Sequence, residues 1–155
     1  MTSNNIGPFL AVILAAYPEW EKFPLVERIG DGWQGIALTI EPPEGSDIDF
    51  GLDIEEVGNE VTISFDYAHL HMQWPPVYQE AVDPIWWDAQ VLIAAILADR
   101  IVASSGWIDG ELRAGSLHPS EAPVELLVPA LEHIRVRSWE GTFSRDEGIV
   151  QLQHP

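Results

Sequence analysis

The stretch that decides the fold is residues 49–66, DFGLDIEEVGNEVTISFD. Apolar residues take every second position on both sides of Val57-Gly58-Asn59, namely Phe50, Leu52, Ile54, Val61, Ile63 and Phe65. A period of two is typical of a β-strand with one buried face. A tight turn between two such strands places both apolar sets on the same side of the pair. The stretch therefore predicts an antiparallel hairpin with one apolar face and one acidic face.

The polar face of this hairpin is acidic. Its carboxylates, together with one from the segment just before it, are Asp47, Asp49, Asp53, Glu55, Glu60 and Asp66. Like charges opposite one another destabilise a sheet, so selection for folding alone would favour a Lys or Arg among them. The alternatives are a docking surface for a basic partner, a simply solvated face, and a calcium site. The sequence lacks the Asp-x-Asp-x-Asp-Gly loop of common calcium sites.

Acidity extends well beyond the hairpin. Between Ile29 and Asp99 there are fourteen Asp and Glu residues and no Lys or Arg, and the whole chain has a formal net charge of −18. Such a charge repels nucleic acid and anionic membranes and attracts basic proteins or cations. Apolar residues make up 46% of the chain, which includes seven Trp, so this is not the composition of a disordered acidic tail.

Length and composition predict one cytoplasmic domain that covers residues 1–155. The chain has no Cys, which excludes disulfides, thiolate metal ligands and cysteine nucleophiles. Two apolar runs, residues 9–17 and 91–98, are too short for a membrane span of about 20 residues. No Lys or Arg precedes the first run, which argues against a secretory signal. Both runs therefore predict buried helices.

Helix signals occur twice. Asn4 or Asn5 can cap a first helix that ends before Pro18. Asp83-Pro84 starts a second helix, which runs to about Val102 and is apolar on most of its circumference. A helix of this kind is buried, so we expect it to lie across the inner face of the sheet.

Other segments complete the sheet. Residues 33–40 and 133–139 alternate like strands, and residues 107–112 predict a second hairpin around Asp-Gly. Residues 20–29 are a proline-broken connection or a short helix, and residues 120–131 stay ambiguous because prolines interrupt them. The sum is an α+β fold, an antiparallel β-sheet packed on one face by one or two helices.

Two histidines, His69 and His71, stand at alternate positions after the hairpin. If the preceding strand continues, Tyr67 and both histidines extend its apolar row. Two imidazoles at this spacing can chelate a metal, with His118, His133 or an acid as a further ligand. The interpretation we favour is a partly buried polar cluster of Tyr67 with both histidines, and we expect no bound metal or cofactor.

Four aromatic residues, Trp74, Tyr78, Trp86 and Trp87, lie close together in the sequence. Aromatic side chains are enriched at the centres of protein interfaces, but they are also ordinary core material. Adjacent residues of a helix point about 100° apart, so Trp86 and Trp87 cannot both face inward. One of them, with Trp74, can stay at the surface beside the acidic stretch. Trp74 therefore joins the six carboxylates as a candidate partner-binding residue.

Catalytic signatures are lacking. The sequence has no Gly-x-Ser-x-Gly elbow, no phosphate-binding loop and no dinucleotide fingerprint. Arg135 and Arg137 form the only close basic pair on a predicted strand face, so we expect no nucleic-acid partner. We also expect that the protein is not an enzyme.

Three segments together resemble small bacterial immunity proteins that are encoded beside polymorphic toxins. They are residues 61–71, VTISFDYAHLH, residues 83–90, DPIWWDAQ, with the apolar helix after them, and residues 109–112, DGEL. The resemblance covers about residues 33–115 and does not extend to residues 116–155. It implies an acidic α+β protein that binds and blocks one cognate toxin, and it supplies no catalytic residues.

Three functional hypotheses follow from the sequence. The first, which we rank highest, is a binding protein that neutralises a basic partner, a cognate toxin above all, through its acidic face. The second is a self-associating structural domain that uses exposed Trp and the apolar helix. The third is a metal-binding protein or metal-dependent enzyme that uses His69 and His71.

Overall fold

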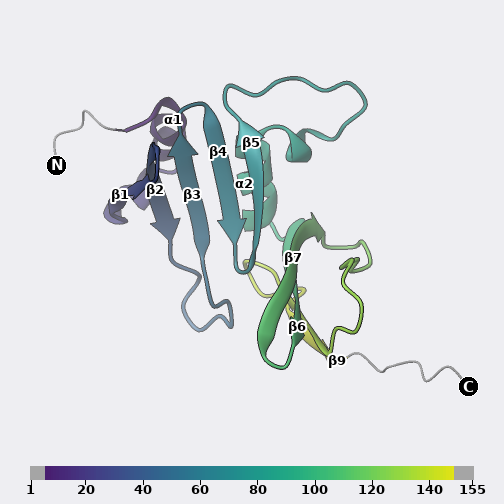
Figure 1. Cartoon of the computed structure of the whole chain (residues 1–155). Coiled ribbons are helices and arrows are strands. Elements are labelled where there is room, and N and C mark those ends of the chain that lie inside the picture. Colours follow the sequence, from purple (N-terminus) through teal and green to yellow (C-terminus); the bar gives the residue numbers. More distant parts are fainter. Residues whose placement is uncertain (1–5, 149–155) are drawn as a thin grey trace, which may run out of the picture.

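The computed structural model describes residues 6–148, and these residues form an α+β fold of two antiparallel sheets and two α-helices (Figure 1). The first sheet contains β1 (Leu25–Gly30), β2 (Trp33–Ile40), β3 (Leu52–Val57), β4 (Glu60–Phe65) and β5 (Ala68–Gln73). Its strands are ordered β1-β2-β3-β4-β5, so each pairs with its neighbour in the sequence.

The predicted hairpin is confirmed as β3 and β4. Val57 lies opposite Glu60 across a two-residue turn, and Gly58 in that turn has a φ of 59°. The apolar residues of both strands, Leu52, Ile54, Val61, Ile63 and Phe65, are fully buried. The period of two therefore identified the buried face correctly.

The start of the hairpin differs from the prediction. β3 begins at Leu52, and Phe50 lies in the preceding loop with 57% of its surface exposed. The backbone passes close to β2 at Gly51, where an added Cβ would lie 1.9 Å from the carbonyl oxygen of Ile40. Only glycine permits that approach, so the alternating pattern extends two residues further in the sequence than in the strand.

Two helices cover one face of the five-stranded sheet (Figure 1). α1 (Pro8–Ala16) has Gly7 as its N-cap, and the predicted caps Asn4 and Asn5 lie outside the described residues. α2 (Ala89–Leu97) is capped by Asp88, which accepts a hydrogen bond from the Gln90 amide. The helices bury Phe9, Leu10, Ile13, Leu92, Ile93 and Ile96 in one core with the strands. The predicted packing of helices on one face of a sheet is confirmed.

Both predicted ends of the second helix are wrong. Asp83-Pro84 starts a separate 3₁₀ helix over Pro84–Trp86, so α2 begins only at Ala89, and it does not extend to Val102. α2 ends at Leu97, Asp99 has a φ of 58°, and the chain continues as β6 (Ile101–Ile108). The Asp99 carboxylate accepts hydrogen bonds from the amides of Glu140 and Thr142, at 2.9 and 3.3 Å. The first residues of β6 are buried on both faces. A strand of this kind lacks alternation, so it cannot be told from a buried helix by periodicity.

The second sheet is formed by β6, β7 (Glu111–Pro119), β8 (His133–Arg137) and β9 (Arg145–Gly148), in the order β7-β6-β8-β9. The predicted hairpin around Asp109-Gly110 is confirmed, since Ile108 lies opposite Glu111. The strand predicted over residues 133–139 ends two residues early. That these strands form a sheet of their own was not predicted.

Two short 3₁₀ helices, η2 (Pro18–Lys22) and η3 (Pro84–Trp86), complete the elements. The interpretation of residues 20–29 as a connection or a helix is wrong for its second half, which is β1. As an edge strand β1 has weak alternation, because side chains on both its faces are partly exposed. None of the helices among residues 6–148 is long and apolar enough to cross a membrane.

Candidate functional site

Side chains from both sheets meet at the turn between β4 and β5. The Asp49 Oδ2 atom accepts hydrogen bonds from the Tyr67 hydroxyl at 2.6 Å and from Arg135 Nη1 at 2.7 Å. The Arg135 guanidinium lies over the Tyr67 ring, 5.5 Å from its centre. Trp107 contacts the same ring edge-on at 4.8 Å. We call Asp49, Tyr67, Trp107 and Arg135 the junction cluster.

Electrostatics in the junction cluster follow from these contacts. The hydrogen bond from Tyr67 and the contact with Arg135 lower the pKa of Asp49. The bond to the Asp49 carboxylate in turn raises the pKa of Tyr67 to about 12. Asp66 behaves differently, because burial raises the pKa of its carboxyl although the Asp49 and Phe50 amides donate hydrogen bonds to it. Asp49 is therefore held ionised and Tyr67 protonated.

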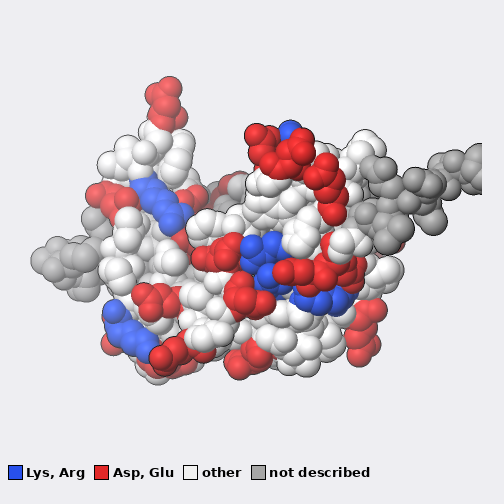
Figure 2. Space-filling view, turned by 90° about the horizontal axis from the view of Figure 1, so that it is seen from below, with Lys and Arg blue, Asp and Glu red and all other residues white. Residues whose placement is uncertain are grey.

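A second ion-pair group lies beside the junction cluster. The Arg137 side chain is only 5% exposed, and it contacts Asp146 at 2.7 Å and Asp47 at 3.6 Å. Its guanidinium also donates hydrogen bonds to the carbonyl oxygens of Asp47 and Arg145. The Asp47 carboxylate nevertheless stays 63% exposed. In Figure 2 the basic side chains of this end of the molecule lie among carboxylates.

The predicted acidic face of the hairpin is partly neutralised within the chain. Arg28 of β1 contacts Asp53 at 2.7 Å and Glu55 at 2.9 Å, across the intervening strand β2. These hydrogen bonds raise the pKa of Arg28. The two carboxylates are about 20% exposed, whereas Glu60 on the same face is 60% exposed.

The structure thus divides the predicted site into three places. Asp53, Glu55 and Glu60 lie on the outer face of the first sheet, opposite the helices, as predicted. Asp47, Asp49 and Asp66 lie instead in the loop before β3 and the turn after β4, next to β8. Trp74 is partly buried and contacts Phe9 of α1 edge-on at 4.8 Å. Trp74 therefore does not share a surface with the carboxylates.

The histidines also lie differently from the prediction. β4 ends at Phe65, and after the turn at Asp66 the chain reverses into β5, which places His69 and His71 on the outer face. Both are exposed, and Tyr67 packs against Trp107 rather than with them. The predicted continuation of the strand and the predicted polar cluster are both wrong. Among residues 6–148, no group of three or more His, Asp or Glu residues is placed to hold a metal ion.

One serine and one histidine form a close pair. The Ser104 hydroxyl lies 2.5 Å from His118 Nε2, and His118 Nδ1 faces the Pro119 carbonyl at 2.9 Å. Such a pair can activate a serine nucleophile when a substrate reaches it. Ser104 is fully buried in the second sheet, so its hydroxyl is closed to a substrate in this structure.

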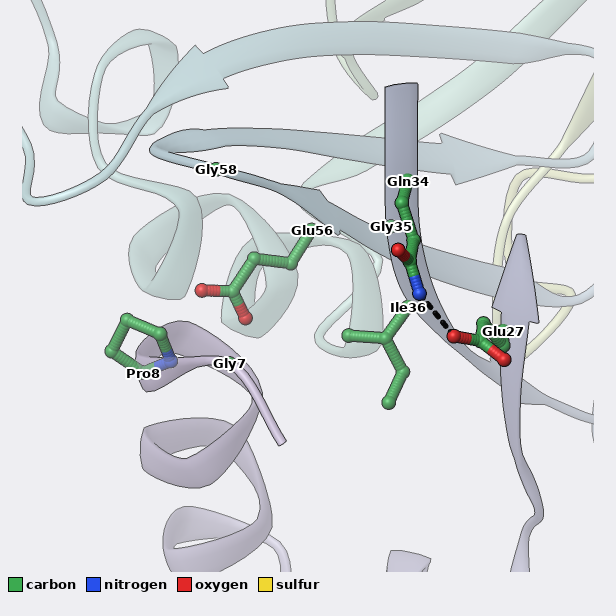
Figure 3. Close-up of a pocket in the computed structure, with 8 residues that line it drawn as sticks. All are labelled: Gly7, Pro8, Glu27, Gln34, Gly35, Ile36, Glu56 and Gly58. Carbon is green, nitrogen blue, oxygen red and sulfur yellow. Dashed lines mark hydrogen bonds between the residues drawn. The ribbon is translucent and has the colours of Figure 1, made fainter. Parts of the chain in front are cut away.

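A cavity of about 400 Å³ lies where the N-terminus of α1 meets the first sheet (Figure 3). Its lining residues are Gly7, Pro8, Glu27, Gln34, Gly35, Ile36, Glu56 and Gly58. Glu56 is 4% exposed, and its two oxygens accept hydrogen bonds from the Phe9 and Leu10 amides, each at 3.0 Å. Both oxygens are used by the helix end, so Glu56 holds α1 on the sheet.

Sequence reasoning missed the arginines as partners of the acidic residues. Arg28, Arg135 and Arg137 all lie outside the acidic stretch in the sequence, and Arg135 is 86 positions from Asp49. The alternation of basic and apolar residues in β8 was the available signal, but it does not indicate which carboxylates the arginines meet. Comparison with known proteins adds no partner, since no family model, no curated protein and no solved structure matches this chain.

Proposed function

We propose that this chain is a cytoplasmic binding protein that associates with a basic protein, and that it acts as an immunity protein against a cognate bacterial toxin. The observation that carries the proposal is that most basic residues of the chain pair with its own carboxylates. Five of its seven basic residues, Arg28, Arg113, Arg135, Arg137 and Arg145, contact its own carboxylates. A net charge of −18 remains, and a basic partner would supply the missing charge.

Exposure suggests which carboxylates would meet the partner. Asp53 and Glu55 are largely occupied by Arg28, and Asp49 by Tyr67 and Arg135. The loop between β2 and β3, at the lower end of the sheet in Figure 1, presents the exposed residues Glu41, Glu44 and Asp47. Asp47 also contacts Arg137, at 3.6 Å, but its side chain stays 63% exposed. We call these three residues the loop carboxylates. Exposed charges at an interface rim act mainly on association rate and specificity.

The test begins with a lysate of the organism that encodes the chain, from which the immobilised chain captures its partner. The dissociation constant of the purified pair is then measured. The variant Glu41→Gln/Glu44→Gln/Asp47→Asn removes three charges and is expected to weaken binding about tenfold, equivalent to ~1.4 kcal/mol. The matched control Glu19→Gln/Glu21→Gln/Glu80→Gln removes three exposed charges elsewhere and should change binding much less. A partner without excess positive charge, or equal effects of both variants, would contradict the proposal.

Self-association is a second candidate, favoured by β1, which is an edge strand of the first sheet. Ile29 is 73% exposed, Val26 is 47% exposed, and Trp33 on the adjacent strand is 43% exposed. Uncovered edge strands can pair with another chain. The net charge of −18 opposes the approach of a second copy, so we rank this candidate lower. Light scattering over a range of concentrations decides it, because a strict monomer at high salt excludes it.

A further inference from the structure

We propose that His69 and His71 form a binding site for a divalent first-row transition-metal ion, with Zn²⁺ as its probe. The two residues occupy alternate positions of β5, so both side chains stand on the outer face of the sheet. Their rings are 5.1 Å apart and nearly perpendicular. β5 is the last strand of its sheet, and both histidines are exposed to solvent.

The neighbours of His71 determine which ring nitrogen is available. His71 Nδ1 lies 3.1 Å from the Glu60 carboxylate and 2.9 Å from the Thr62 hydroxyl. A nitrogen that faces a carboxylate carries the proton, which leaves a lone pair on Nε2. Metal-binding histidines are commonly oriented by a carboxylate in this way. Glu60 is therefore the positioning residue for His71.

The surroundings favour a cation and leave it room. Both histidines are open to solvent. A cavity of about 320 Å³ is lined by Asn59, Glu60, His71, Met72 and Gln73, next to His71 but not to His69. No third protein ligand converges on the pair within residues 6–148, so water completes the coordination. Imidazole ligands select zinc, copper or nickel over magnesium and calcium. The strongly negative net charge adds a long-range attraction for any cation.

Calorimetric titration of the full chain with Zn²⁺ tests the site. We expect one ion per chain, and at least tenfold weaker binding in both His69→Ala and His71→Ala. Glu60→Gln should weaken binding about tenfold while both ligands remain. His133→Ala, in the second sheet, is the matched control and should bind as the wild type does. Ring proton signals of His69 and His71, followed by NMR, should shift together during the titration.

Three results would overturn the proposal. Absence of one-to-one Zn²⁺ binding, or wild-type binding by either histidine variant, excludes the site, provided that circular dichroism shows the variants folded. Wild-type binding by Glu60→Gln overturns the positioning role of Glu60. The site does not depend on the proposed function, because the loop carboxylates lie on another part of the chain and neither test uses the other's variants.

Discussion

At the scale of single residues, the best-defined feature is the hydroxyl of Tyr67. It donates to Asp49 in the loop before β3, and the Tyr67 ring lies between Arg135 of β8 and Trp107 of β6. The backbone at this turn is also tightly packed, since a Cβ on Gly115 of β7 would lie 2.2 Å from the Tyr67 carbonyl oxygen. One side chain thus joins the two sheets.

The contact between Tyr67 and Asp49 predicts a pH dependence of stability. The pKa of Tyr67 is about 12 in the folded chain and 10.0 in its ordinary state. A folded-state pKa above the unfolded one gives stability that is complete below pH 10 and is lost as the pH rises towards 12. Tyr67→Phe should therefore lower the free energy of unfolding by about 1 kcal/mol at neutral pH. As the pH rises above 10, the variant should lose less stability than the wild type does.

Urea unfolding at several alkaline pH values measures this difference. Tyr78→Phe is the matched control, because Tyr78 is 74% exposed, and it should follow the wild-type profile. Burial also raises the pKa of Tyr17, but that residue is the same in all three proteins. Parallel profiles for wild type and Tyr67→Phe would contradict the assigned role of the hydroxyl.

The sequence singled out Asp49, Tyr67 and Arg135 of the junction cluster and the neighbouring Asp66, but it did not single out Trp107 and did not predict that these residues meet. Asp49 and Asp66 fit the alternation of the hairpin, and this placed them on its polar face. The structure instead has Asp66 in a turn with a φ of 51°, where its carboxylate accepts from the Asp49 amide. Turn geometry and long-range partners such as Arg135 depend on the tertiary fold, and no local period encodes them.

At the scale of elements, α1 depends on a residue that belongs to β3. The second and third amides of a helix have no partner within the helix itself. In α1 these are the amides of Phe9 and Leu10, and Glu56 accepts from both. Gly7 permits the contact, since an added Cβ would lie 2.3 Å from the Glu56 carboxylate. The sequence pattern shows only that Glu56 shares a face with Leu52 and Ile54.

Replacing Glu56 should therefore destabilise the whole fold. Glu56→Ala leaves two buried amides without acceptors, and we expect a loss of about 3 kcal/mol in the free energy of unfolding. Glu56→Gln retains one acceptor oxygen and should lose less. Glu60→Ala is the control, because its side chain is 60% exposed, and a change within about 0.5 kcal/mol is expected. Equal losses at positions 56 and 60, measured by urea unfolding, would be incompatible with this role.

The elements themselves differed in how far they could be predicted. The segments with a clear period of two in the sequence are residues 33–40 and the β3–β4 hairpin, and both were found. In the hairpin one face is buried and the other is partly exposed to solvent, whereas in β2 the neighbouring residues Ala37 and Leu38 are both buried. The boundary between α2 and β6 was missed because residues 91–98 and 101–103 are all apolar, so neither segment shows an alternation that would separate a buried helix from a buried strand. β1 was missed because it is an edge strand, whose exposed side chains do not alternate.

At the scale of the whole molecule, the main feature is that charges are balanced around the arginines although the net charge of the chain is strongly negative. Near the arginines the carboxylates are compensated, as Figure 2 shows, and the fold gains contacts between the two sheets. Over the whole chain 25 Asp and Glu stand against seven Lys and Arg, so the net charge stays strongly negative. The field that a distant molecule meets is negative, and the proposed function rests on this field.

The most direct test of that account is the dissociation constant of the chain with its captured partner as a function of salt. Ions screen exposed charges over roughly 8 Å at physiological ionic strength. We expect affinity to fall about tenfold between low and physiological salt, mainly through the association rate. The loop-carboxylate variant should show a shallower dependence on salt than the wild type. Affinity that is independent of salt would contradict an electrostatic mechanism and leave the acidic surface without the proposed role.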